Sequence, residues 1–465
     1  MAVDPKTAWQ PYTPRTDAPW DRKAVGHLYR RAGFGATAAE LDAGVKDGPA
    51  KALDRVLTGA SETDDFTRTS DFMASARSMP TGAPQQRLSA WWIDRMLKTR
   101  HPLREKMTLF WHNHFATSNA KVLNARFMLG QYRLIQTHAL GCFADLLTAM
   151  GTDPAMLVWL DTNTSTKAAP NENYAREVME LFSLGVGNYT ETDIREAAKA
   201  FTGYEIRDGK GALNPRQHDA GEKTVFGKKG AFTGEDVAKL CLDHPACPRF
   251  IVRKLYRFLV SDTDTPPAEL IDPLAEEYRA SGFNTGTLVS TILRSNVFFS
   301  PTAYRAKIKS PVEFVVGTVR TLEGGTGALP LADALDSLGQ VLFAPPSVKG
   351  WDGGPAWLNA QTLLGRNNIA LALTSTEDGR FGARCDPAEL LAKHGIKGDA
   401  ETVDFLLGLF LQGDAPPATR NKLLDYLRST KDVKYPAYWT GDDLAAHRTR
   451  AVTHLALTLP EYQLN

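Results

Sequence analysis

"SPVEFVVGTVRTLEGG", residues 310–325, contains the signals that mark both ends of an α-helix. Ser310 is a typical N-cap residue, and Pro311 fits the first helical position. Glu313 stands three residues after Ser310, where the glutamate of a capping box is expected. A glycine pair, Gly324 and Gly325, follows the apolar run and is a typical helix end. The stretch therefore predicts one well-delimited helix.

The same signals recur along the chain. Thr37 and Glu40 form a capping box in "TAAELDAGV", and Thr190 and Asp193 form another in "TETDIREAAKAFTG", which ends at Gly203. Apolar residues with a period near 3.6 predict further helices at residues 22–33, 85–99, 102–113, 123–149, 171–184, 235–243, 247–261, 267–280, 286–295, 387–394, 402–411, 416–430 and 443–458. Strand-like alternation is scarce, so we predict a mainly α protein: a multi-helix globular assembly with long irregular loops and little β structure.

The length of 465 residues is enough for two or three domain-sized cores, although large helical proteins often fuse such cores into one body. Four prolines in the first twenty residues predict an extended N-terminal arm over residues 1–21. We expect a helical domain that carries the candidate site over residues 22–300. A helical C-terminal region, residues 301–465, should pack on it.

Composition excludes several classes of protein. Charged residues make up 23% of the chain and the net charge is +1, so no strong basic field favours nucleic acid. The apolar run "RFIVRKLYRFLV" is interrupted by Arg253, Lys254 and Arg257, so we expect no membrane span. No export signal is visible at the N-terminus, which favours the cytoplasm. The cysteines lack metal-site spacing and are expected to be free thiols: Cys142, Cys241, Cys247 and Cys385.

Two long segments fall outside the helical pattern. Residues 203–232 are polar and rich in glycine, and loops of that length in compact proteins are usually functional or disordered. Residues 341–362, "VLFAPPSVKGWDGGPAWLNAQT", contain Trp351 and Trp357 among glycines and prolines. An ordered aromatic loop is expected there.

A histidine pair at the end of an amphipathic run raises the question of a metal site. "FWHNHFATSNAK", residues 110–121, places His112 and His114 two residues apart. On a continuing helix their side chains would diverge by about 200°, so one ion can bind both only if the helix ends there. The alternative is that both histidines are packing or hydrogen-bonding side chains.

A second possible metal-binding pair lies in the polar segment. His218 and Asp219 are adjacent, and neutral imidazole with carboxylate suits Zn²⁺, Mn²⁺ or Fe²⁺. The alternative is a turn in which Asp219 bonds the backbone ahead of Gly221. Neither pair is a complete site by itself.

Glu177 falls at the edge of the apolar stripe formed by Tyr174, Val178 and Leu181. A carboxylate among core-facing positions must be paired, protonated or bound to a cation. It is either one partner of a structural ion pair or part of a reactive site.

These motifs occur together in one order: "HLYRRAGFGATAAEL", "LREKMTLFWHNHFATS", "PNENYAREVMELFSLGVGNYTETDIREAAKAFTGY", "RQHDAGEKTVFG", "HPACPRFIVRKLYRFLV", "VKGWDGGPAWLNAQTLLGRNN" and "LPEYQ". In this set the chain resembles the bacterial family called domain of unknown function 1800 over nearly its whole length. The resemblance implies that the histidine, Glu177 and His-Asp segments are signature segments and share one site. It also implies a location outside the cytoplasm, because many relatives look exported.

We therefore expect a metal-dependent enzyme, more specifically a hydrolase that acts on an anionic or sugar-like substrate. His112, His114, His218 and Asp219 are the expected ligands of a divalent Zn, Mn or Fe ion, and Glu177 is a further ligand or the general base.

Arg176 or Lys223 is expected to hold the anionic group of a small-molecule or glycan substrate. One alternative is an iron- or copper-dependent oxidoreductase that uses the same ligands. The other is a non-catalytic scaffold or glycan-binding protein whose contact surface is the aromatic loop around Trp351 and Trp357.

Overall fold

The computed structural model describes residues 4–382, 385–429 and 440–465. Helices dominate this part of the chain, and its strands form two small antiparallel sheets, so the mainly α prediction is confirmed. The helices are α1 (Pro5–Ala8), α2 (Arg22–Ala32), α3 (Ala38–Thr58), α4 (Asp64–Met73), α5 (Gln85–Lys98), α6 (Pro102–His114), α7 (Asn119–Val122), α8 (Ala125–His138), α9 (Phe143–Met150), α10 (Pro154–Trp159), α11 (Asn173–Glu180), α12 (Glu191–Ala200), α13 (Gly234–Asp243), α14 (Ala246–Leu259), α15 (Ala268–Ala280), α16 (Thr285–Arg294), α17 (Pro311–Thr321), α18 (Ala328–Ser337), α19 (Ala360–Thr374), α20 (Pro387–Lys393), α21 (Asp399–Phe410), α22 (Pro417–Ser429) and α23 (Gly441–Leu457). The strands are β1 (Tyr204–Arg207), β2 (Lys210–Leu213), β3 (Lys223–Val225) and β4 (Lys228–Gly230).

All three predicted capping boxes are present. The side chain of Ser310 accepts from the Glu313 backbone N–H at the start of α17, and the Glu313 carboxylate accepts from the Ser310 N–H. Equivalent reciprocal bonds begin α3 at Thr37 and α12 at Thr190. The sequence near each box is enough to begin these helices, because the box bonds the free N–H groups of its own first turn.

The predicted helix over residues 123–149 is divided into α8 and α9. The break lies at Cys142, whose backbone is extended and forms an isolated antiparallel bridge with Asn284. The N–H of Phe143 donates to the carbonyl of Phe283 at 2.9 Å. A partner distant in sequence therefore overrides the local helical period.

The stretch of residues 203–232 contains two β-hairpins and is less irregular than predicted. Asp208 and Gly209 join β1 to β2, and Phe226 and Gly227 join β3 to β4, all four with positive φ. Two-residue turns of this kind match the right-handed twist of the flanking strands. The Asp-Gly dipeptide is the sequence signal for the first hairpin.

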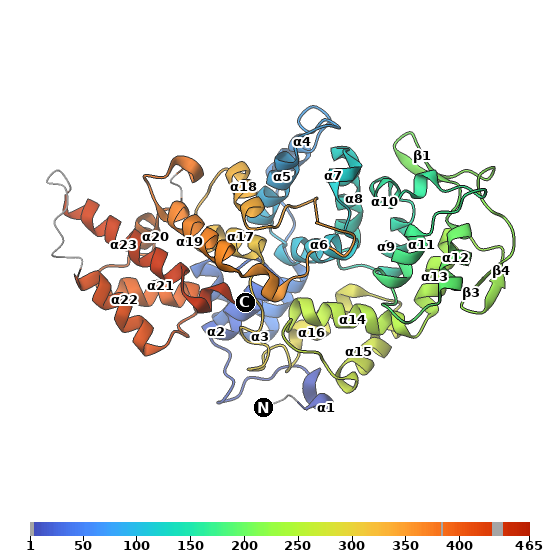
Figure 1. Ribbon diagram of the computed structural model, residues 1–465. Helices are drawn as coiled ribbons and strands as arrows, with labels where there is room; N and C mark the ends of the chain where they lie inside the picture. The colour runs from blue at the N-terminus through green and yellow to red at the C-terminus, as the bar shows by residue number, and fades with distance from the viewer. Residues whose placement is uncertain (1–3, 383–384, 430–439) are drawn as a thin grey trace.

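Helix α6 lies between the two ends of an elongated molecule (Figure 1). Helices α19 to α23 occupy one end, and the hairpins with α10 to α13 occupy the other. One hydrophobic core contains Trp111 of α6 and most of the buried apolar residues up to Ala303. The other contains Leu109 of α6 with Val25, Trp92 and buried apolar residues of the C-terminal helices. The C-terminal end of α6 therefore projects between the two cores.

None of the helices in the described ranges combines the length and apolarity of a membrane span. The four cysteines are free thiols, as expected.

Candidate functional site

Helix α6 ends at the last residue of the His-Asn-His motif, so His112 and His114 both lie on the helix and their side chains diverge. Its last helical residue is His114, and Phe115 leaves the helical conformation with φ −97° and ψ 48°. The polar side chains of His112, Asn113 and His114 then bond three different segments of the chain.

His112 holds the segment that leads to the aromatic loop. Its Nε2 accepts a hydrogen bond from the backbone N–H of Phe343 at 3.1 Å, and its ring packs against Trp92 with centroids 5.2 Å apart. Burial lowers the pKa of His112 to about 3. The imidazole is therefore neutral at physiological pH and acts as an acceptor.

Asn113 fixes the aromatic loop itself. Its Oδ1 accepts from the N–H of Trp351 at 2.7 Å, and its Nδ2 donates to the carbonyl of Trp351 at 3.3 Å. Gly350 has φ +81°, and a Cβ on it would collide with the Asn113 side chain and carbonyl. The loop can approach the helix end this closely only because residue 350 is glycine.

His114 holds a lysine. Its Nε2 lies 3.0 Å from the carbonyl of Phe182, which can only accept, so Nε2 carries the proton and Nδ1 is the acceptor. Lys254 Nζ lies 3.0 Å from that Nδ1 and 3.1 Å from the carbonyl of Leu181. Burial, with a smaller contribution from the Arg257 charge, lowers the pKa of Lys254 to about 8.

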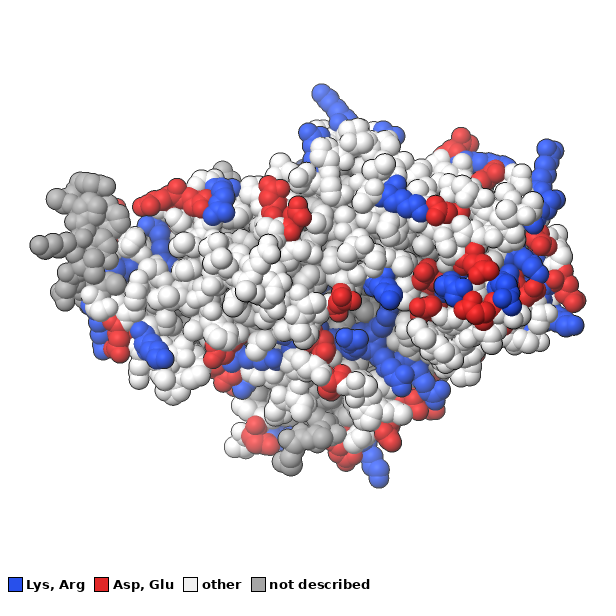
Figure 2. Space-filling view, viewed as in Figure 1, with Lys and Arg blue, Asp and Glu red and all other residues white. Residues whose placement is uncertain are grey.

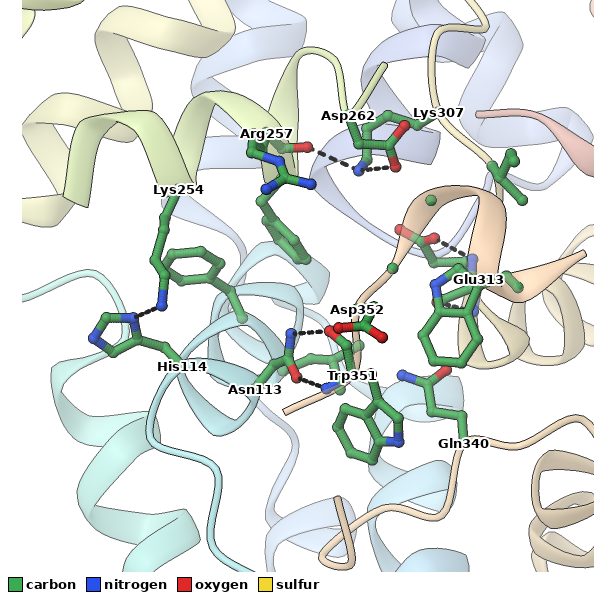
Figure 3. A pocket seen from close by; sticks show the side chains of 18 of the residues that line it. Asn113, His114, Lys254, Arg257, Asp262, Lys307, Glu313, Gln340, Trp351 and Asp352 are labelled. Atoms are coloured by element: carbon green, nitrogen blue, oxygen red, sulfur yellow. Dashed lines mark hydrogen bonds and ion pairs between the residues drawn. The ribbon is translucent and has the colours of Figure 1, made fainter. Parts of the chain in front are cut away.

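Asn113, His114 and Lys254 line a cavity of about 300 Å³ between α6, α14 and the segments 307–313 and 349–357 (Figure 3). Figure 2 shows Lys and Arg side chains gathered around a hollow near the middle of this face. The cavity draws its walls from both of the predicted regions, 22–300 and 301–465. The polar and aromatic lining residues are Asn113, His114, Lys254, Arg257, Phe258, Asp262, Lys307, Ser310, Glu313, Gln340, Lys349, Trp351, Asp352 and Trp357.

The cavity wall contains charged groups whose hydrogen-bonding capacity is not fully used. Asp262 accepts from Lys307 Nζ through Oδ2 at 3.1 Å, while its buried Oδ1 has no hydrogen-bond partner among the described residues. Arg257, Lys349 and Asp352 form no ion pair within the described part of the chain. The pocket therefore offers free cations and free carboxylate oxygens to the same small volume.

The aromatic loop lies against the body of the protein. Trp351 and Trp357 are 7% and 9% exposed, and both line the cavity. Such burial does not fit a flat, exposed glycan-binding face. It fits a pocket with aromatic walls.

His218 and Asp219 form the turn that was the alternative to a metal site. His218 Nδ1 bonds the carbonyl of Thr202 at 3.0 Å, and Asp219 Oδ1 accepts from the Gly221 N–H at 2.8 Å. Lys223 Nζ donates to the carbonyls of Asp219 and Gly221 at 2.5 and 3.0 Å. Lys223 therefore stabilises the turn, and its ammonium is occupied by carbonyl groups.

The structure does not bring the four expected ligands together as a metal-binding group. Across residues 4–382, 385–429 and 440–465, no three His, Cys, Asp or Glu side chains are grouped so that they could hold an ion. Each group instead forms hydrogen bonds with a different part of the chain. His112 bonds Phe343, His114 bonds Phe182 and Lys254, and His218 bonds Thr202.

Glu177 is half-buried, and its carboxylate takes part in no hydrogen bond or ion pair among the described residues. Burial and then the neighbouring Glu180 raise its pKa, whereas Arg176 and Lys349 act in the opposite direction. Arg176 is itself bound to Glu191 at 2.9 Å and to Glu172 at 3.3 Å. Its guanidinium is therefore committed to two carboxylates on the surface.

Sequence reasoning missed the cations and carboxylates of the cavity. Lys254 and Arg257 stand three residues apart on α14, a spacing that places both on one face. Their signal was present as charges that interrupt an apolar run. The contributions of Asp262, Lys349 and Asp352 depend on loops, for which the sequence carries no comparable period.

Neither a curated protein nor a solved structure matches the chain. One family model, described as "Protein of unknown function (DUF1800)", matches residues 27–464. This match covers nearly the whole chain and agrees with the order of the motifs, so the protein belongs to the DUF1800 family.

Proposed function

We propose that the protein is an enzyme that binds a small anionic or sugar-like substrate in the cavity beside α14 and hydrolyses it with Lys254 as the proton-transferring group. The observation that carries this proposal is the fixed position of Lys254, whose half-buried side chain lies in the cavity wall and is held by His114 and the Leu181 carbonyl.

Anionic substrates suit the unpaired cations. Arg257 and Lys349 line the cavity without carboxylate partners among the described residues. Phosphate, sulfate and carboxylate groups form strong, charge-assisted hydrogen bonds with such unpaired cations. An anionic group is therefore the expected recognition element.

Hydroxyl-bearing substrates suit the remainder of the wall. Trp351 and Trp357 supply apolar ring surface, while Asp262 Oδ1 and the exposed Asp352 carboxylate supply acceptors for hydroxyl groups. A volume of about 300 Å³ lies at the lower end of small-molecule sites. A monosaccharide-sized molecule is the matching class.

The hydrogen bonds of Lys254 leave one position of its Nζ for chemistry. A neutral amine has two N–H groups and one lone pair, and the acceptors His114 Nδ1 and Leu181 O use both N–H groups. The lone pair is then free to take a proton from water or a substrate hydroxyl. A pKa of about 8 keeps both protonation states populated near neutral pH, as a general base requires.

The predicted divalent metal, and the alternative of redox-active iron or copper, stay predictions. Elemental analysis of the purified protein tests them, because zinc or manganese, iron or copper, and the absence of a stoichiometric ion point to different reactions. The proton-transfer proposal itself uses groups that the chain supplies.

A second candidate is a non-catalytic receptor that uses the same pocket. It is favoured by the two tryptophans in the wall, which suit the binding of a sugar ring whether or not a reaction follows. Saturable binding of an acidic sugar without turnover would favour this candidate.

The test is a panel of chromogenic phosphate, sulfate and carboxylate esters and glycosides, assayed with the full chain. We expect turnover with an apparent pKa near 8, and a loss of about 10²- to 10⁴-fold in kcat for Lys254→Arg, whose guanidinium keeps the donors but does not deprotonate. Arg257→Gln should raise KM about tenfold or more with little change in kcat.

Arg253→Gln is the matched control, because Arg253 is exposed on the same helix and does not line the cavity. Equal activity of Lys254→Arg and wild type on an accepted substrate would contradict the role of Lys254.

A further inference from the structure

Beneath the substrate cavity, cationic side chains are concentrated around Glu313. Each is at most 8% exposed, and together they come from α2, α6, α19 and the segment before α17. They are Arg30, Arg31, Lys106, Lys307, Lys309 and Arg366.

Carboxylates do not balance these cations in the described part of the chain. Glu313 pairs with Lys106, and Asp262 pairs with Lys307. Arg31 and Arg366 donate to backbone carbonyls, at 2.5 Å to Ala303 and at 2.7 Å to Lys309 respectively. Carbonyl dipoles only partly compensate a buried full charge, so the cluster remains electrostatically unfavourable.

Arg30 and Lys309 are the two members without a carboxylate or backbone carbonyl acceptor among the described residues. Arg30 Nη1 donates to Gln412, whereas its buried Nε and Nη2 have no hydrogen-bond partner among the described residues. Lys309 Nζ lies 3.5 Å from the ring centroid of Tyr462 and forms no hydrogen bond with the residues that the structure describes. Both side chains keep unused N–H donors in the interior.

These two side chains line the same small cavity, which is separate from the substrate cavity except that Glu313 borders both. Its volume is about 20 Å³, and its polar wall also includes Gln412, Tyr462 and Asn465. Asn465 Nδ2 is buried and has no partner in the described part of the chain. The wall therefore contains buried N–H groups whose hydrogen bonds are not made.

We propose that this cavity is a buried anion site that holds one halide ion of chloride size, bound by N–H groups of Arg30 and Lys309. A volume of about 20 Å³ suits a monatomic ion, and a larger tetrahedral oxyanion such as sulfate or phosphate fits it less well. An ion there accepts the unused donors and offsets part of the excess positive charge.

The electrostatics agree with such a site. Burial, followed by the charges of Arg30 and Arg366, lowers the pKa of Lys309 well below its usual range, and the opposing charge of Glu313 does not offset these effects. The ion would join α2, the start of α17, the end of α21 and the last residues of the chain, which all border the cavity. Its role is structural, and it is independent of the proposed reaction.

The test compares thermal unfolding of the full chain in sodium chloride, bromide, sulfate and gluconate at matched ionic strength. Chloride and bromide should raise Tm saturably, by about 2 °C or more at saturation, and sulfate and gluconate should not. Lys309→Met should abolish the halide effect, whereas Arg257→Gln, in the substrate cavity, should retain it.

Crystals of the wild-type protein grown in bromide give a direct readout that does not depend on whether Lys309→Met folds. An anomalous bromide peak between Arg30 and Lys309 is expected. The absence of a peak at this position, a halide effect that survives in Lys309→Met, or a saturable sulfate effect that needs Lys309 would each overturn the proposal.

Discussion

Lys254 Nζ donates to Nδ1 of His114 across 3.0 Å, and the opposite nitrogen of the same imidazole donates to the carbonyl of Phe182. Both ring nitrogens are thus occupied by protein groups. The histidine that the sequence presents as a metal ligand serves in this structure to position a lysine whose pKa is lowered to about 8.

The lowered pKa of Lys254 predicts a specific dependence of stability on pH. Because the folded-state pKa of about 8 lies below the ordinary value of 10.5, the folded protein holds fewer protons than the unfolded chain between these values. The free energy of unfolding should therefore rise with pH over this interval, by up to about 3 kcal/mol relative to Lys254→Met. Urea unfolding of both proteins at pH 7, 9 and 10.5 measures the difference, and parallel pH profiles would contradict the assignment.

Gly350→Ala should detach the aromatic loop from α6. The added Cβ collides with Asn113, and φ +81° is itself unfavourable for alanine, so we expect a loss of about 2–4 kcal/mol and faster proteolysis within residues 344–358. Gly339→Ala is the control, because Gly339 has φ +85° and open space around it. It should lose only about 1 kcal/mol, and an equal loss in both variants would show that backbone strain alone is responsible.

Glu177→Gln distinguishes an unpaired carboxylate from an ion-paired one. Its pKa is raised, so the charged form destabilises the folded protein above that pKa, and this penalty disappears as the pH falls toward 4.5. We expect the variant to equal wild type or exceed it by about 0.5–1 kcal/mol at pH 7, with a smaller difference at pH 5. Glu172→Gln, which loses the pair with Arg176, should instead lose up to about 1 kcal/mol. A loss of about 3–5 kcal/mol in Glu177→Gln would indicate a buried ion pair.

Glu313 and Lys106 form a buried ion pair in a cation-rich environment. Removing the carboxylate should therefore cost more stability than removing the lysine. Burial raises the pKa of Glu313, but Lys106 and Lys307 outweigh it and hold the pKa at about 2. Glu313→Gln should lose about 3–5 kcal/mol, although glutamine retains the capping box of α17. Lys106→Met should lose less, because it also removes one of the repelling cations. Unfolding in guanidinium chloride measures the free energy of unfolding of both variants. A larger loss of stability in Lys106→Met than in Glu313→Gln would mean that the cluster is not cation-rich.

The sequence by itself determined the helical class and many helix ends. Capping boxes at Thr37, Thr190 and Ser310 act within four residues, so the same local hydrogen bonds form whatever the rest of the chain does. It also determined the family, because the order of the motifs is a property of the chain alone. The alternative reading of Asp219 as a turn residue is local in the same way.

Only the tertiary structure decided which polar side chains meet. His112, Asn113 and His114 are neighbours in sequence, yet their partners are Phe343, Trp351 and Lys254. The helix period fixes the directions of these side chains but not what lies opposite them.

The segment opposite each side chain depends on how the two cores pack around α6, and this involves contacts across more than a hundred residues. The excess of cations around Glu313 is decided in the same way, because charges spread from residue 30 to residue 366 appear balanced along the chain and become unbalanced only when folding buries them together.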